Sequence, residues 1–268
     1  MAVSLFLDGK AALITGGSRG IGAETVRLFC QAGARVAFNY RRAGAQAEAL
    51  AAECRGVGAT GAPNCFAIEQ DLTSLAHGRA LVEKAVAALG RLDILVANHG
   101  IWEAEDVPVE RMTEAQWRRT LGVNLDAVFG LVQAATAQML RQPMPAGGEA
   151  RGHIVLISST AGQRGEAFHA DYAVTKGALI SLTKSLSSEL APKGIRVNCV
   201  APGWVATDMS AAALADSAVG AKILAGIPVG RPASPREIAG PVLFLCSPLA
   251  GFISGEILNV NGGAVLVG

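Results

Sequence analysis

The sequence predicts an α/β fold in which seven parallel strands form one doubly wound sheet with helices on both faces. Short apolar runs alternate with longer, helix-like stretches along the chain. Near-continuously apolar strands are typical of a parallel sheet that is buried on both faces, and strands alternating with helices predict right-handed βαβ units. No linker-like stretch divides the 268 residues, so we expect a single domain over residues 1–268.

The pattern places the strands and helices in strict alternation and leaves two long connections. The segment 142–152, with two prolines and three glycines, is expected to be a surface loop. The segment 203–233 is longer than a simple connection needs; it is either a substrate lid, because ligands bind at the carboxyl ends of such strands, or a plain surface excursion. The expected strands are 10–15, 35–40, 64–70, 92–98, 153–158, 195–201 and 256–260, and the expected helices are 21–33, 43–56, 74–89, 114–141, 172–191 and 235–247.

Composition and charge exclude several classes of function. The chain is 51% apolar and 17% charged, which is ample for a large core. With 23 basic and 22 acidic residues it has no electrostatic footprint for a nucleic acid or an anionic membrane, and we expect neither partner. The N-terminal apolar run is too short for a signal peptide and no window approaches a membrane span, so we expect a cytoplasmic protein.

Cysteine and histidine spacing predicts neither disulfides nor a metal site. The five cysteines are odd in number, widely spaced and free of CxxC, which indicates a reducing compartment. Cys199, within the apolar run "IRVNCVA", reads as a buried small hydrophobe. The four histidines show no ligand spacing, and we expect no metal.

A glycine-rich turn follows the first expected strand. The stretch "TGGSRGIG" (15–22) puts Gly16, Gly20 and Gly22 between that strand and a helix. Glycines there permit a tight turn and close backbone approach, and the helix N-terminus attracts phosphate. The turn therefore predicts dinucleotide binding, although any tight strand-to-helix turn can use glycine.

Polar residues follow the later strands. The stretch "HADYAVTK" (169–176) places Tyr172 and Lys176 one helical turn apart on one face, which suits either a functional pair or two solvated side chains. Ser159, in "SSTAG" at the end of the fifth strand, precedes Tyr172 by thirteen residues, so strand, loop and helix can bring the two together. Asn124 lies inside an apolar helical stretch, where a structural hydrogen bond is the ordinary reading.

With these motifs in order, the chain resembles the short-chain dehydrogenase/reductase family from Gly9 to Gly263, which implies a Rossmann fold and an oxidoreductase. The resemblance implies that Tyr172 is the proton donor, that Ser159 binds the substrate oxygen, that Lys176 also holds the nicotinamide ribose, and that Asn124 anchors a proton-relaying water. The matching residues are Gly16, Gly20, Gly22, Asp71, Asn98, Gly100, Asn124, Ser159, Tyr172, Lys176, Pro202, Gly203 and Thr207.

The chemistry of these side chains agrees with those roles. Hydride transfer to a carbonyl leaves negative charge on oxygen, and an unperturbed tyrosine has a pKa of about 10. We expect the ammonium of Lys176, together with the nicotinamide ring, to lower the pKa of Tyr172 by roughly 3 units, which needs about 4 kcal/mol of differential interaction.

The resemblance also implies a cofactor site, and the residues at its phosphate end favour NADP(H) over NAD(H). The second strand ends "NYRR", so that Tyr40 stands where NAD-binding folds carry an acidic residue, and Arg41 and Arg42 follow it. Arg19 in the glycine turn and Arg41 suit a 2′-phosphate, whereas Arg42 reads as a solvated turn residue. The expected cofactor-binding residues are Gly16, Ser18, Arg19, Gly20, Ile21, Gly22, Tyr40, Arg41, Asp71, Leu72, Asn98, Gly100, Tyr172, Lys176, Pro202, Gly203, Val205 and Thr207.

Within the family, the chain is most similar to 3-oxoacyl-acyl-carrier-protein reductases, in "VNCVAPGWVATDM" and "ISGEILNVNGG". We therefore expect reduction of a 3-oxoacyl thioester or small ketone; a sugar or polyol dehydrogenase and a non-catalytic nucleotide-binding protein are the alternatives. A carrier-protein partner would need basic residues near the entrance, for which Arg151 and Lys193 are candidates. The resemblance implies a homotetramer, with the apolar "GGAVLVG" (262–268) buried between subunits or packed on its own subunit.

The chain departs from the family pattern at His99, in "ANHG" where Asn-Asn-Ala-Gly is common. His99 either shapes the substrate pocket or packs structurally. Trp102, Trp204 and Phe168 flank the motifs and either line an apolar pocket or belong to the core.

Overall fold

A seven-stranded parallel sheet runs through the protein in the order β3-β2-β1-β4-β5-β6-β7. The computed structural model describes residues 5–55, 57, 64–145 and 150–267. Every expected strand is confirmed, and the molecule is a single domain of the Rossmann type. The strands are β1 (Ala11–Ile14), β2 (Arg35–Tyr40), β3 (Cys65–Glu69), β4 (Ile94–Ala97), β5 (Gly152–Ile157), β6 (Ile195–Pro202) and β7 (Ile257–Val260).

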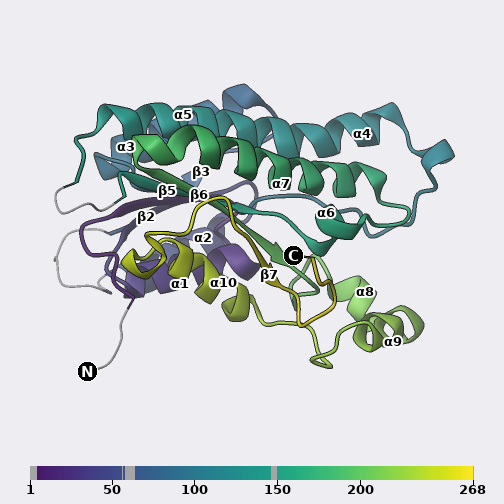
Figure 1. Ribbon diagram of the computed structural model, residues 1–268. Helices are drawn as coiled ribbons and strands as arrows, with labels where there is room; N and C mark the ends of the chain where they lie inside the picture. The colour runs from purple at the N-terminus through teal and green to yellow at the C-terminus, as the bar shows by residue number, and fades with distance from the viewer. Residues whose placement is uncertain (1–4, 56, 58–63, 146–149, 268) are drawn as a thin grey trace.

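Helices cover both faces of the sheet, as the apolar strands require (Figure 1). One face carries α3 (Leu75–Leu89), α5 (Ala127–Arg141) and α7 (Ala170–Leu190). The other carries α1 (Gly20–Gln31), α2 (Gly44–Cys54) and α10 (Pro235–Leu245).

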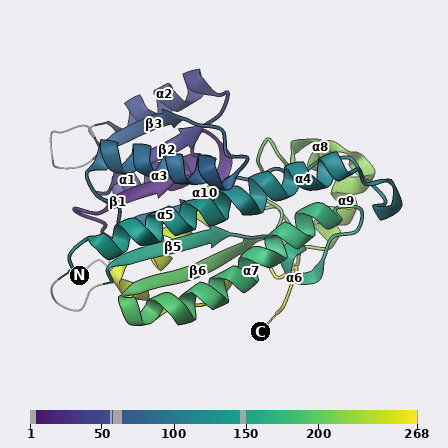
Figure 2. The ribbon, with the colours of Figure 1, turned by 90° about the horizontal axis from the view of Figure 1, so that it is seen from above.

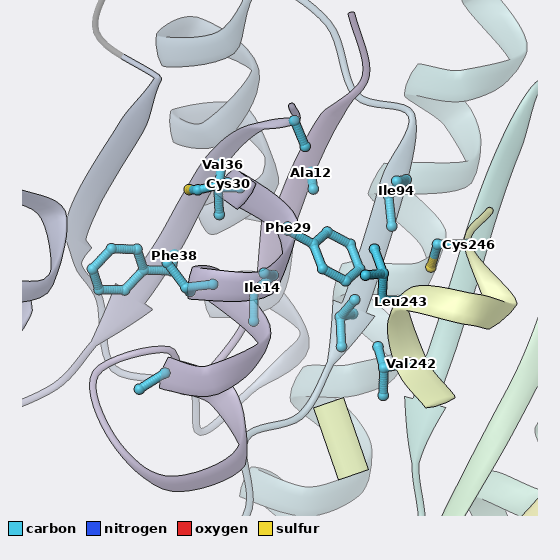
Figure 3. Packing of buried hydrophobic residues seen from close by; sticks show 14 of the residues in the cluster. Ala12, Ile14, Phe29, Cys30, Val36, Phe38, Ile94, Val242, Leu243 and Cys246 are labelled. Carbon is cyan, nitrogen blue, oxygen red and sulfur yellow. The ribbon is translucent and has the colours of Figure 1, made fainter. Parts of the chain in front are cut away.

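Two hydrophobic clusters result, one on each side of the sheet. Successive strand residues point to opposite faces, so β1 sends Ala12 and Ile14 into one cluster and Leu13 into the other. Figure 3 shows the first cluster, where Phe29 of α1 lies between the strands and Leu243 of α10. Burial on both faces explains why the strands are near-continuously apolar.

The long helix expected over 114–141 is broken in its middle. It divides into α4 (Glu114–Leu121), a π-helical turn Gly122–Asp126, and α5. Gly122 allows close approach to the connection between β3 and α3, because a Cβ there would lie 2.8 Å from the carbonyl oxygen of Thr73. Such π turns are frequent at functional sites, and this one carries Asn124.

The strand order reverses between β1 and β4, which opens a crevice at the carboxyl ends of these strands. Beyond that edge lie α6 (Thr160–Arg164), α8 (Ala211–Ala215) and α9 (Ser217–Ala225), as Figure 2 shows. The last two helices belong to the long segment 203–233. Part of the loop expected at 142–152 falls outside the described residues.

No helix in the described ranges is long and apolar enough to cross a membrane.

Candidate active site

A pocket of about 570 Å³ lies at the carboxyl ends of the strands and collects most of the predicted site residues. Ser159 lines it, whereas Gly22 and Asn124 do not. The expected cofactor-binding residues that line it are Gly16, Ser18, Arg19, Gly20, Ile21, Tyr40, Arg41, Asp71, Leu72, Asn98, Gly100, Tyr172, Lys176, Pro202, Gly203, Val205 and Thr207.

The glycine turn is closed tightly, and Asn39 fixes it to the sheet. Gly16 has a φ of +64°, and a Cβ on Gly22 would lie 2.1 Å from the carbonyl oxygen of Gly16. The Gly16 amide donates to Oδ1 of Asn39 at 2.8 Å, and Nδ2 of Asn39 donates to the Gln70 carbonyl at 2.9 Å. Asn39 was missed at the sequence level; its signal is a polar residue inside the apolar run "RVAFNY".

His99 is held as a neutral ring between three segments. Nε2 of His99 donates to the Val123 carbonyl at 3.0 Å, which leaves Nδ1 to accept from Oγ1 of Thr15 at 2.8 Å. Burial, and secondarily the charge of Lys176, lowers the pKa of His99 to about 4. Both readings of this residue therefore hold in part, since the ring packs structurally and also lines the pocket.

Tyr172 and Lys176 lie on α7 beside Ser159, which caps the N-terminus of α6. Oγ of Ser159 accepts from the Ala161 amide at 3.1 Å and forms a hydrogen bond with Tyr172. Nζ of Lys176 donates to the Ile157 carbonyl at 2.8 Å and lies 5.6 Å from the centre of the Tyr172 ring. Lys176 is buried, so the alternative that its side chain is merely solvated is wrong.

The chain's own groups shift the pKa of Tyr172 upward, opposite to the sequence expectation. Burial raises the pKa of Tyr172 to about 12; the hydrogen bond with Ser159 acts against this and the charge of Glu166 adds to it. Burial also lowers the pKa of Lys176 to about 8. The expectation was wrong for these groups because the ammonium of Lys176 is directed at the Ile157 carbonyl and desolvation dominates.

Asn124 anchors the loop that follows β4. Its Oδ1 accepts from the Ile101 amide at 2.8 Å and its Nδ2 donates to the Ile101 carbonyl at 2.9 Å. The neighbouring Gly100 leaves room beside it, since a Cβ there would lie 3.3 Å from Oδ1 of Asn124 and 3.4 Å from Nζ of Lys176. The π turn thus brings the asparagine next to the lysine without exposing it.

The remaining wall of the pocket combines aromatic and charged side chains. Trp102 packs edge-on against Trp204, with ring centres 6.0 Å apart, and lies 5.0 Å from the ring of His169. Glu166 also lines the pocket; burial raises its pKa, whereas its hydrogen bond with Trp102 lowers it. Phe168 is half exposed and is not a lining residue. The charge on this wall was missed because the loop 165–169, which carries Glu166, contains no motif.

At the opposite end of the pocket, the lining is cationic and exposed. Arg19, Arg41 and Arg42 all line this end, and all three are exposed. The positions directly after β2 hold no carboxylate. Nη1 of Arg19 contacts Oδ2 of Asp208, in the 203–233 segment, at 3.4 Å.

Arg151 and Lys193 do not lie near the entrance, contrary to expectation. Arg151 directly precedes β5 and Lys193 lies two residues before β6, so both are at the amino-terminal edge of the sheet. There the Arg151 amide donates to the Gly194 carbonyl, and Lys193 pairs with Glu189. Arg164, exposed and lining the pocket, is a cation that does stand at the entrance.

Comparison with known proteins agrees with this geometry. A family model described as Enoyl-(Acyl carrier protein) reductase matches residues 16–265. The chain is 39% identical to 3-oxoacyl-[acyl-carrier-protein] reductase of Staphylococcus aureus, over 95% of this chain and 97% of the relative. A crystal structure of a short chain dehydrogenase from Burkholderia cenocepacia in complex with NADP aligns with a TM-score of 0.85 and 33% identity, covering 96% of this chain and 98% of that one.

A putative NAD(P) dependent gluconate 5-dehydrogenase from Beutenbergia cavernae, with bound NADP, also aligns with a TM-score of 0.85. It is 37% identical, over 97% of this chain and 98% of that one. Both the matching motifs and these full-length similarities lead to one conclusion: the chain belongs to the short-chain dehydrogenase/reductase family and is an oxidoreductase of that family.

Proposed function

We propose that this protein uses NADP(H) to reduce a carbonyl to a secondary alcohol, with 3-oxoacyl thioesters or small ketones as substrates. The single observation that carries the proposal is the group of Ser159, Tyr172 and Lys176, which lines one end of a pocket whose other end is a glycine turn. Lys176 is buried, and Ser159 and Tyr172 are partly buried. The similarity to the Staphylococcus aureus reductase supports the thioester class.

The pocket fits a phosphorylated dinucleotide. Gly16, Gly20 and the N-terminus of α1 provide backbone close to a pyrophosphate, and Arg19 and Arg41 provide cations for a 2′-phosphate. Tyr40 stands where a carboxylate would repel that phosphate, and Arg41 follows it. The bound cofactor supplies the hydride, and the chain supplies position and electrostatics.

Tyr172 and Ser159 act on the substrate oxygen. Their hydroxyl groups hold the carbonyl oxygen, so that negative charge developing on it meets two hydrogen-bond donors in a desolvated site. Tyr172 then transfers its proton to that oxygen. Its raised pKa keeps it protonated at neutral pH, as the reducing direction requires.

Lys176 and Asn124 support the tyrosine. The ammonium of Lys176 would hold the ribose of the cofactor, and at 5.6 Å from the Tyr172 ring its charge offsets part of the cost of burying the tyrosinate left after proton transfer. Both polar groups of the Asn124 side chain are engaged by Ile101. We therefore assign to Asn124 the positioning of the loop 100–101 beside Lys176, and its Oδ1, which can accept a second hydrogen bond, would anchor the proton-relaying water.

The segment 203–233 serves as the lid over the substrate. Thr207, Asp208, Met209 and Ser210 line the pocket, and the contact between Asp208 and Arg19 joins this segment to the glycine turn. Arg164 gives the entrance a cation for an acidic carrier protein. We place the protein in the cytoplasm, where its five free cysteines stay reduced.

We also propose a homotetramer. Phe252, Leu266 and Val267 are exposed, whereas Val265 is buried on its own subunit. The C-terminal run thus packs in part on its own chain and in part offers an apolar surface to another. Light scattering at micromolar concentration tests this, and a mass of 27.4 kDa would refute it.

A second candidate is a sugar-acid or polyol dehydrogenase, and Glu166 is the observation that favours it. A carboxyl group in the pocket wall offers a hydrogen-bond partner to a hydroxyl-rich substrate, while an acyl chain has no use for it. The gluconate 5-dehydrogenase similarity points the same way.

One panel separates the candidates. The rate of NADPH absorbance loss is measured with 3-oxoacyl thioesters, small ketones and keto sugar acids, in wild type and in Glu166→Gln. The proposal expects the thioester or ketone to be preferred and the variant to keep that activity. A preference for the sugar acid that Glu166→Gln lowers about tenfold, the cost of exchanging a charge-assisted hydrogen bond for a neutral one, would favour the second candidate.

A further inference from the structure

Three cysteines far apart in sequence meet in the core at the edge of the sheet opposite the active site. Cys30 lies near the end of α1, Cys54 ends α2 and Cys65 begins β3. Their Sγ atoms all lie within 4.8 Å of one another, and all three residues are at most 2% exposed. Figure 3 shows Cys30 within the hydrophobic cluster on the α1 side of the sheet, beside Val36 of β2.

The donor set is purely sulfur. Within the described part of the chain, no histidine or carboxylate joins the group of three thiols. Thiolates select soft ions, and a structural zinc site needs a fourth ligand that this group does not offer. The thiols already interact with one another, since the proximity of Cys30 and Cys65 lowers the pKa of Cys54.

Charge then decides among soft ions that accept three sulfur ligands. Three thiolates around a monovalent copper ion leave two negative charges in an apolar core, which is costly to bury. A trivalent ion cancels them. The two cations that act on these thiols do not compensate, because Arg27 is paired with Glu53 at 2.8 Å and Arg55 with Glu48 at 3.5 Å.

We propose that Cys30, Cys54 and Cys65 form a binding site for trivalent arsenic, taken up as arsenite. Three thiols and one As(OH)₃ give one neutral As(S-Cys)₃ and three waters. Three As–S bonds replace three As–O bonds, and each thiol proton leaves with a hydroxide as water. Arsenic keeps its oxidation state. The product ties α1, α2 and β3 together and stabilises this half of the sheet.

The site is separate from catalysis. Cys30 and Gly20 are ten residues apart on α1, which is about 15 Å along a helix. Arsenic bound here leaves the glycine turn in place, so we expect the turnover of the arsenic-bound enzyme to stay within about twofold of that of the free enzyme. The bound arsenic raises the stability of the protein.

The test uses the reduced full-length protein and native mass spectrometry with thermal unfolding, in separate samples with sodium arsenite, monovalent copper and zinc. Arsenite is expected to bind one arsenic per chain and to raise Tm by about 5 °C at saturating excess. Cys54→Ser should lose at least about tenfold in arsenite affinity. Cys246→Ser is the matched control, since it alters an equally buried thiol outside the group, and it should keep the full shift.

Each variant is compared with itself in the absence of arsenite, so a lower starting stability does not obscure the shift. X-ray absorption on the wild type counts the ligands without any substitution, and three sulfur neighbours around arsenic are expected. No bound arsenic, fewer than three sulfur neighbours, an unchanged affinity in Cys54→Ser, or tighter binding of copper than of arsenite would overturn the proposal.

Discussion

The two ends of the active-site pocket are built on opposite physical principles. At the catalytic end, Lys176 and Tyr172 are desolvated, and burial moves the pKa of each away from its ordinary value. At the phosphate end, Arg19 and Arg41 are exposed. Interactions in a desolvated site are strong and respond to pH, whereas those of exposed charges are weaker and respond to salt. Substitutions at the two ends should therefore have different effects on activity, with a pH dependence at the catalytic end and a salt dependence at the phosphate end.

The largest effect is expected at the catalytic end, from Tyr172→Phe. Loss of the hydroxyl removes the proton donor, and we expect the rate of carbonyl reduction to fall by at least about 10²-fold while cofactor affinity stays nearly intact. Steady-state kinetics and NADPH fluorescence titration measure the two quantities. Retention of more than about a tenth of the wild-type rate would remove Tyr172 from the role of proton donor.

A smaller but distinctive effect is expected from pH. Because the pKa of Lys176 is about 8, its ammonium is present below that pH and is lost as the pH rises through it. Tyr172 remains protonated over the same range. We expect the reduction rate to decline as pH rises through 8, and Lys176→Met to be slow with no such decline. If Lys176→Met showed the same decline, a group other than Lys176 would be its cause.

The smallest effect is expected at the phosphate end, from Arg41→Ala. A charge-assisted hydrogen bond of about 1.5–3 kcal/mol corresponds to a ten- to hundredfold preference for NADPH over NADH, and we expect the variant to lose about tenfold of it. The loss should shrink at high salt, because the contact is exposed. The ratio of kcat/KM for the two cofactors gives the answer; equal efficiency in wild type, or no change in the variant, would contradict phosphate recognition.

The fold and the motif-bearing part of the site were predictable from the sequence, because local patterns determine them. Apolar runs define the strands, and glycines at Gly16 and Gly22 are required by local backbone geometry. Features that depend on distant segments meeting were not predictable. The group of Cys30, Cys54 and Cys65 has no spacing signal, since three separate elements bring it together.

The same holds for properties that depend on burial. The direction of the Tyr172 pKa shift follows from desolvation and from the orientation of the Lys176 ammonium. Neither can be deduced from the spacing of the two residues in the sequence. Glu166 similarly enters the pocket through the path of its loop.

Direct titration of Tyr172 tests the central claim, that the catalytic end is a desolvated acid. The chain has only two tyrosines, so the ultraviolet difference between wild type and Tyr172→Phe isolates the ionisation of Tyr172 in the cofactor-free protein. The account predicts almost no tyrosinate from Tyr172 at pH 10, since burial raises its pKa to about 12. Half-ionisation at pH 10 or below, as in an unperturbed tyrosine, would contradict it.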